Sequence, residues 1–99
     1  MSIWSEPMIP KQFSLLGQTV KVVIVPQKRW KRLNIEGHWN PNRNTISICD
    51  AVPEDRLQQV FCHEMIHAIL DSMNSPMSTD EVFVDNFAGL LCQAWGTIK

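Results

Sequence analysis

Two histidines with a glutamate between them form the stretch of this sequence best suited to chemistry. It reads His63-Glu64-Met65-Ile66-His67. Residues four apart on a helix share a face, so both imidazoles can reach one ion at about 2.0–2.1 Å, with Glu64 beside its open side. Zinc lowers the pKa of a bound water to about 7, and a neighbouring carboxylate can take its proton. The motif therefore predicts zinc bound by His63 and His67, with Glu64 as general base.

The third metal ligand must come from another part of the chain, because a catalytic zinc commonly has three protein ligands and an open fourth position. The downstream candidates are Asp80, Glu81 and Asp85. Glu81 and Asp85 would share one helix face, where two carboxylates repel each other by roughly 0.2–0.5 kcal/mol unless a cation lies near them. We assign Glu81 to the metal and Asp85 to a supporting position, where it accepts a ring N–H from a ligand histidine.

The motif lies in a segment with helical periodicity. Pro53 suits the first position of a helix, and Glu54 and Asp55 complement the positive end of the helix dipole. Apolar residues then recur at three- and four-residue intervals from Leu57 to about Asp71. Their wide spread around the axis predicts a helix that is largely buried.

A second helix is expected from Ser78 onward. The run Asn74, Ser75 and Pro76 interrupts the first helical pattern, and Ser78 is followed three residues later by Glu81, the pattern of a capping box. The apolar face of this helix is formed by Val82, Phe83, Phe87, Leu90, Leu91 and Ala94.

Both site assignments have simpler alternatives. The two histidines could lie on an exposed helix face without sharing a ligand, although unpaired polar groups are costly on so apolar a helix. Glu81 could serve only to complete the capping box with Ser78. Since a hydroxyl of Ser78 or Thr79 can cap a helix alone, the capping requirement does not exclude Glu81 as a metal ligand.

The segments before the motif read mainly as strands. Residues 1–12 form an irregular lead-in, and no regular element is expected before Gly17. Residues 19–25 are rich in β-branched side chains and predict a strand. Residues 35–39 and 45–49 flank an Asn- and Pro-rich turn and predict a hairpin.

Composition sets outer bounds on function. With 99 residues, 44% hydrophobic, the chain is expected to form a single domain spanning residues 1–99. The net charge of −1 gives no overall attraction to nucleic acid or to an anionic membrane. Cys49, Cys62 and Cys92 are odd in number and widely spaced, which favours reduced thiols and a cytoplasmic location.

One basic stretch, residues 28–32, surrounds Trp30 and would suit phosphate contacts with the indole stacked on a base. Four charges in a nearly neutral chain more often form a solvated loop, and the indole can turn inward. We therefore do not expect nucleic acid or a membrane as a partner, although a metalloprotease recruited to nucleic acid through this basic loop stays a second alternative.

Taken together, the motif and the later acids resemble the gluzincin group of metallopeptidases, in which His-Glu-x-x-His on one helix is joined by a glutamate on a later helix. More narrowly, residues 81–91, EVFVDNFAGLL, are similar to the second-helix segment of short phage and bacterial metallopeptidases related to the ImmA/IrrE family. The hairpin before the first helix also fits, and the resemblance covers residues 13–95.

The resemblance implies an α+β, minimal zincin-like core, with a small antiparallel sheet packed on the motif helix and a second, C-terminal helix. It also implies a Zn²⁺ cofactor and hydrolysis of peptide bonds in a peptide or protein substrate, in the host cytoplasm if the chain is phage-encoded. Residues 45–49, if they form the edge strand, would align an extended peptide by backbone pairing.

Related peptidases often use Tyr or His to stabilise the oxyanion. The chain has no tyrosine, and His38 is the only histidine outside the motif. His38 is therefore the candidate for this role, although a histidine with ordinary hydrogen bonds is the simpler interpretation.

A different class of function is a binding or regulatory module in which zinc only joins two helices of a small core. Glu64 favours the enzyme, because a purely structural zinc needs no base. A fourth protein ligand, for instance His38, would favour the structural role.

Overall fold

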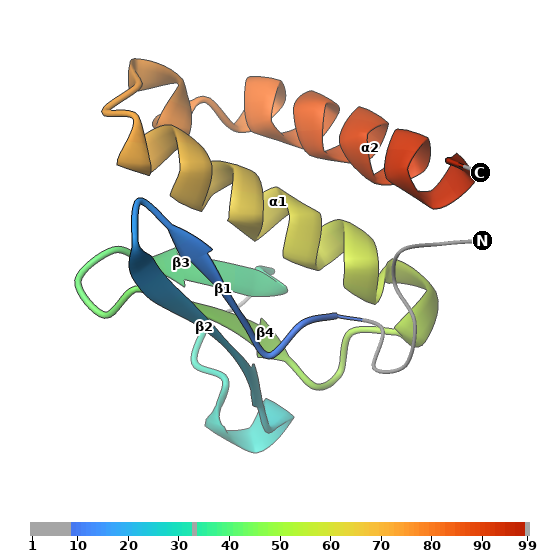
Figure 1. Ribbon diagram of the computed structural model, residues 1–99. Helices are drawn as coiled ribbons and strands as arrows, with labels where there is room; N and C mark the ends of the chain where they lie inside the picture. The colour runs from blue at the N-terminus through green and yellow to red at the C-terminus, as the bar shows by residue number, and fades with distance from the viewer. Residues whose placement is uncertain (1–8, 33, 99) are drawn as a thin grey trace.

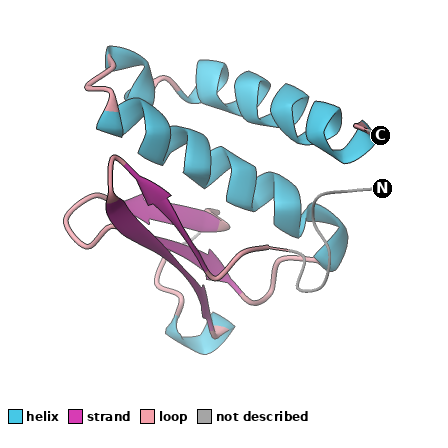
Figure 2. Cartoon of the chain, viewed as in Figure 1, coloured by secondary structure: helices cyan, strands magenta, loops and turns pink. Residues whose placement is uncertain are grey.

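The protein, described by a computed structural model over residues 9–32 and 34–98, has a four-stranded sheet with both helices on one side of it (Figures 1 and 2). The strands are β1 (Gln12–Leu15), β2 (Gln18–Val25), β3 (Gly37–Asn40) and β4 (Thr45–Cys49). The helices are α1 (Glu54–Ser72) and α2 (Glu81–Thr97), and two short 3₁₀ helices are η1 (Gln27–Arg29) and η2 (Pro76–Thr79). The expected α+β class is confirmed. Residues 1–8 of the expected lead-in lie outside the described residues.

The sheet has the order β1-β2-β4-β3 and is mixed. β3 and β4 form the expected antiparallel hairpin, whereas β2 runs parallel to β4, with Lys21 opposite Thr45. The prediction of an antiparallel sheet was therefore wrong in this one pairing. The parallel pair arises because β4, the second strand of the hairpin, joins β2 and leaves β3 at the edge.

The first strand was also missed. β1 pairs with β2 through a two-residue turn in which Leu16 and Gly17 have φ values of 51° and 78°. Two positive φ angles define the hairpin turn that matches strand twist, but Asn-Gly or Asp-Gly is its usual sequence. Because a leucine is rare in that conformation, nothing in the residue types at this position indicated a turn.

Helix α1 lies between the sheet and α2, as Figure 1 shows. On the sheet side Phe61 packs among buried strand residues, and its ring meets Phe13 edge-on at 5.8 Å. On the other side Cys62 and Ile66 pack against Val84 of α2. Two buried sides explain the wide apolar spread of the helix in the sequence. All three cysteines are free thiols, and no helix in the described part of the chain is long and apolar enough to cross a membrane.

The start of α2 differs from the expected capping box. Ser78 lies within η2, and Asp80 is the N-cap, with Oδ1 accepting a hydrogen bond from the backbone N–H of Phe83 at 3.0 Å. Ser75 and Pro76 begin the 3₁₀ turn, which uses residues 76–79 before the helix can start. The carboxylate of Glu81 therefore does not cap the helix.

Gly37 allows β3 to lie directly on α1. A Cβ at this position would be 2.9 Å from Cγ1 of Val60 and 3.0 Å from Cγ of Glu64. The first distance is shorter than real Cβ contacts and the second is tighter than nearly all of them, so a side chain here must displace Val60 or push the edge strand away from the helix.

We expect Gly37→Ala to destabilise the protein by about 1–3 kcal/mol, because the strand must shift from the helix. Gly89 on α2 is the matched control, since a Cβ there would meet nothing within 4 Å. Gly89→Ala should be stabilising by about 0.5–1 kcal/mol, as expected for removing glycine from a helix. Urea denaturation of both variants measures the difference, and an equal effect of the two would contradict the contact.

Candidate metal centre

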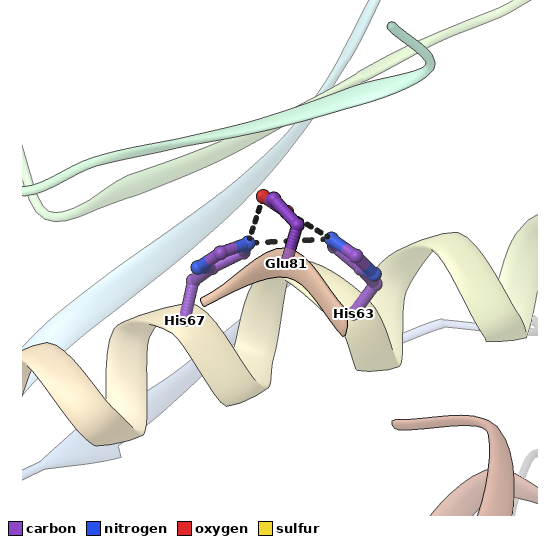
Figure 3. Close-up of side chains that lie close together, drawn as sticks. All are labelled: His63, His67 and Glu81. Carbon is purple, nitrogen blue, oxygen red and sulfur yellow. Dashed lines mark hydrogen bonds and ion pairs between the residues drawn. The ribbon is translucent and has the colours of Figure 1, made fainter. Parts of the chain in front are cut away.

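The ligand atoms of His63, His67 and Glu81 converge on one point (Figure 3). The two Nε2 atoms are 3.2 Å apart, and the Glu81 oxygens lie 3.0 Å from Nε2 of His67 and 3.4 Å from Nε2 of His63. A tetrahedral ion with bonds of about 2.0–2.1 Å separates its ligands by roughly 3.3 Å. The spacing of the three side chains therefore fits zinc, and one tetrahedral position remains for another ligand.

The tautomers of the two imidazoles follow from their outer contacts. Nδ1 of His67 lies 2.6 Å from the backbone carbonyl oxygen of Ser78, which can only accept, so Nδ1 carries the proton. Nδ1 of His63 faces Oδ1 of Asp85 at 3.4 Å. In this state both Nε2 atoms present lone pairs to each other and to the Glu81 carboxylate. Such an arrangement is well suited to a cation, or an added proton, between these groups.

Asp85 thus lies where the sequence predicted, beside His63. The partner of the other histidine was not anticipated, because a backbone carbonyl carries no signature in the sequence. Of the three candidate acids, Glu81 faces the histidines, Asp85 supports His63, and Asp80 caps α2.

Glu64 is the one buried charged residue in the described chain, with 8% of its surface exposed. Burial raises the pKa of its carboxyl group, against the opposing effects of His63, His67 and the backbone N–H of Trp39, which donates to it. A carboxylate with a raised pKa beside a metal site is suited to take and return a proton near neutral pH.

Trp39 fixes the edge strand to α1 at one end. Besides its backbone bond to Glu64, its indole N–H donates to Oδ2 of Asp71 at 3.2 Å. At the other end of the strand Arg56 pairs with Glu36. Glu64 lies on α1 between these two contacts. The tie through Trp39 and Asp71 was not predicted, because it joins residues 32 positions apart.

β3 rather than β4 is the edge strand beside the site. β4 lies between β2 and β3, so the expectation that residues 45–49 align a peptide was wrong. The N–H of Cys49 donates to the carbonyl of Glu36, and alternation then turns the backbone groups of Gly37 and Trp39 to the free edge.

His38 does not join the cluster. Gly37 and Trp39 face α1, so strand alternation turns the His38 side chain to the opposite face of the sheet. There burial and the charge of Arg32 lower its pKa. His38 is among the residues that line the cleft, but it is not a member of the three-residue cluster in the described chain. The structure therefore does not make it a fourth metal ligand, and its oxyanion role stays a prediction.

A cleft of about 690 Å³ contains the cluster. One wall is the loop and strand at residues 34–39, the floor is α1, and Glu81 and Asp85 form the opposite wall at the start of α2. The space is large enough for a stretch of polypeptide.

Comparison of the chain with protein-family models, with curated proteins and with solved structures found no match. The resemblance to gluzincins therefore stays a prediction, and the assignment of function depends on the geometry of the site.

We expect Glu81→Ala to weaken zinc binding by more than about 100-fold, since it removes a proposed direct ligand. Asp85→Asn should weaken it by about 10–100-fold, because Asp85 acts only through the ring of His63. Asp80→Ala is the control: it should keep the affinity for zinc and cost about 1 kcal/mol of stability through loss of the helix cap. Competition titration with a zinc chelator and urea denaturation separate the two effects. Loss of zinc from Asp80→Ala equal to that from Glu81→Ala would refute the assignment.

Proposed function

We propose that the protein is a cytoplasmic zinc metallopeptidase in which Glu64 is the general base. The observation that carries the proposal is the convergence of three lone-pair donors, from His63, His67 and Glu81, beside a buried carboxylate in an open cleft. This set matches a catalytic zinc with three protein ligands.

The residues divide the chemistry among them. A zinc ion held by the three ligands would lower the pKa of a water to about 7 and polarise a substrate carbonyl. Glu64 takes a proton from the attacking water and gives it to the leaving amine nitrogen as the C–N bond breaks. Ser78 and Asp85 keep Nδ1 of each histidine protonated, so that Nε2 stays available to the metal.

The substrate we propose is an extended peptide lying along β3. Because the N–H of Trp39 donates to Glu64, the N–H of Gly37 and the carbonyls of Gly37 and Trp39 are the groups left for a peptide backbone. Pairing with a free strand edge binds the main chain without requiring a particular sequence, which suits a peptidase.

A zinc that only joins two helices is the rival function. Two observations favour the enzyme over it: the group that could hold a metal in the described chain has three members, and Glu64 is buried beside it. A structural zinc is normally closed by four protein ligands and has no use for a buried base.

We expect Glu64→Gln to bind one zinc per chain as the wild type does, but to lose hydrolysis by about 10²–10⁴-fold, because the amide cannot accept the proton. Incubation of the zinc-loaded protein with a diverse peptide library, followed by mass spectrometry, measures the cleavage. Glu54→Gln, an exposed change on the same helix, should leave it unaltered. A wild type that cleaves nothing, or a Glu64→Gln variant that loses its zinc, would contradict the proposal.

The tie between Trp39 and Asp71 should act on catalysis through the position of Glu64. We expect Trp39→Phe and Asp71→Ala each to lower kcat by about 10–100-fold with zinc content unchanged, as for small displacements of a catalytic group. Asp71→Asn keeps an acceptor and should retain most activity. If the bond is the cause, the double variant will be no worse than either single one. Additive losses would show that the two side chains act separately.

A further inference from the structure

Charge in this chain is strongly segregated between the two layers of the fold. Residues 9–44, which include three of the four strands, carry seven Lys and Arg and one acid, Glu36. Residues 45–98, which include both helices, carry eight acids and one cation, Arg56. The sheet layer is therefore basic and the helix layer acidic.

The cations of the sheet layer are all exposed and none forms an ion pair with an acid in the described part of the chain. The one acid among them, Glu36, is already paired with Arg56 of α1. The seven are Lys11, Lys21, Lys28, Arg29, Lys31, Arg32 and Arg43. Asp50, directly after β4, also lies in this layer, where its Oδ1 accepts from the N–H of Gln27 at 2.9 Å, but it forms no ion pair with the seven cations in the described part of the chain. The layer keeps an excess of positive charge, so an external anion is the natural partner.

Several of these cations border the face of the sheet that the helices leave open. Val20 is buried toward α1, so alternation turns Lys21 to the open face. Thr45 and Asn40 lie on the same face as Lys21, because the three residues are in register across the strands. Arg32 lies close enough to His38, which also faces this side, for its charge to act on that ring. The open face thus combines positive charge with polar side chains.

We propose that the open face of the sheet, with the loop at residues 28–32, binds the phosphate backbone of a nucleic acid. The unpaired charges supply affinity for successive phosphates, and the polar side chains between them supply hydrogen bonds to phosphate and sugar oxygens. An anionic membrane fits less well, because peripheral binding also needs apolar side chains to insert, and on β2 alternation places one exposed large apolar residue, Val23, on the open face with Lys21.

Binding by this surface is independent of base sequence. The indole N–H of Trp30 donates to the carbonyl of Ile35 at 2.7 Å, so Trp30 is held by its own loop rather than presented for stacking. Contacts to phosphate alone carry no sequence information. The net charge of the whole chain led us not to expect nucleic acid as a partner. Binding of DNA by this face does not depend on the metal or on hydrolysis.

The test is fluorescence anisotropy of the wild-type chain with labelled 20-nucleotide single-stranded and duplex DNA between 50 and 200 mM salt. We expect binding to both, with affinity falling steeply as salt rises. Lys21→Gln/Arg32→Gln should reduce the slope of log K against log salt by about 1.4–1.8 and weaken binding at least about tenfold near 0.1 M salt, equally for unrelated sequences. Arg56→Gln, the matched change on the helix side, should bind as the wild type does.

Two outcomes would overturn the proposal. One is absence of binding at 50 mM salt, or equal weakening by Arg56→Gln and by the double variant. The other is binding to vesicles of mixed neutral and anionic lipid, or to polyglutamate, with none to DNA. Circular dichroism of the double variant confirms that it folds. Since DNA binding is read without metal, its failure leaves the peptidase proposal standing, and failure of peptidase activity leaves this one standing.

Discussion

The architecture depends on helix α1 being packed on two sides while a third side stays open. Phe61 fills the core toward the sheet, and Cys62 and Ile66 fill the core toward α2. With 100° between successive residues, a helix buried on two sides has only a narrow remaining face, and His63 and His67 occupy it one turn apart. The same packing that stabilises the fold therefore fixes the direction of both imidazoles, and it leaves Glu64 between the open face and the sheet.

The candidate site gathers groups that favour a positive charge between them. Two lone-pair nitrogens and a carboxylate lie within 3.0–3.4 Å of each other, and a second carboxylate, Glu64, is buried beside them. Buried charge is tolerated when it is paired or hydrogen-bonded. The N–H of Trp39 and the two imidazoles provide part of this compensation. A divalent cation would provide the rest, which is why the geometry supports a metal centre more strongly than the motif alone does.

Local features of the sequence predicted local features of the structure. The four-residue spacing of the histidines, the apolar periodicity of both helices and the turn before β4 depend on near neighbours, and each led to the right element. The identity of the edge strand, the parallel pairing of β2 with β4 and the contact of Trp39 with Asp71 depend on residues far apart in the chain. Ser78, the cap expected from the sequence, lies inside the η2 turn, and Asp80 after that turn caps α2 instead.

The net charge alone does not describe the surfaces that a partner would meet, for a physical reason. At physiological salt the field of a charge decays over about 8 Å, whereas the protein measures 36 × 33 × 28 Å. A molecule approaching the open face of the sheet therefore feels the cations of that layer and little of the acids around the cleft. The value of −1 is a sum of two opposite surfaces that screening keeps apart. The same separation lets the acidic side of the cleft lie close to His63 and His67, where its charge favours a cation, without weakening the positive charge of the open face of the sheet.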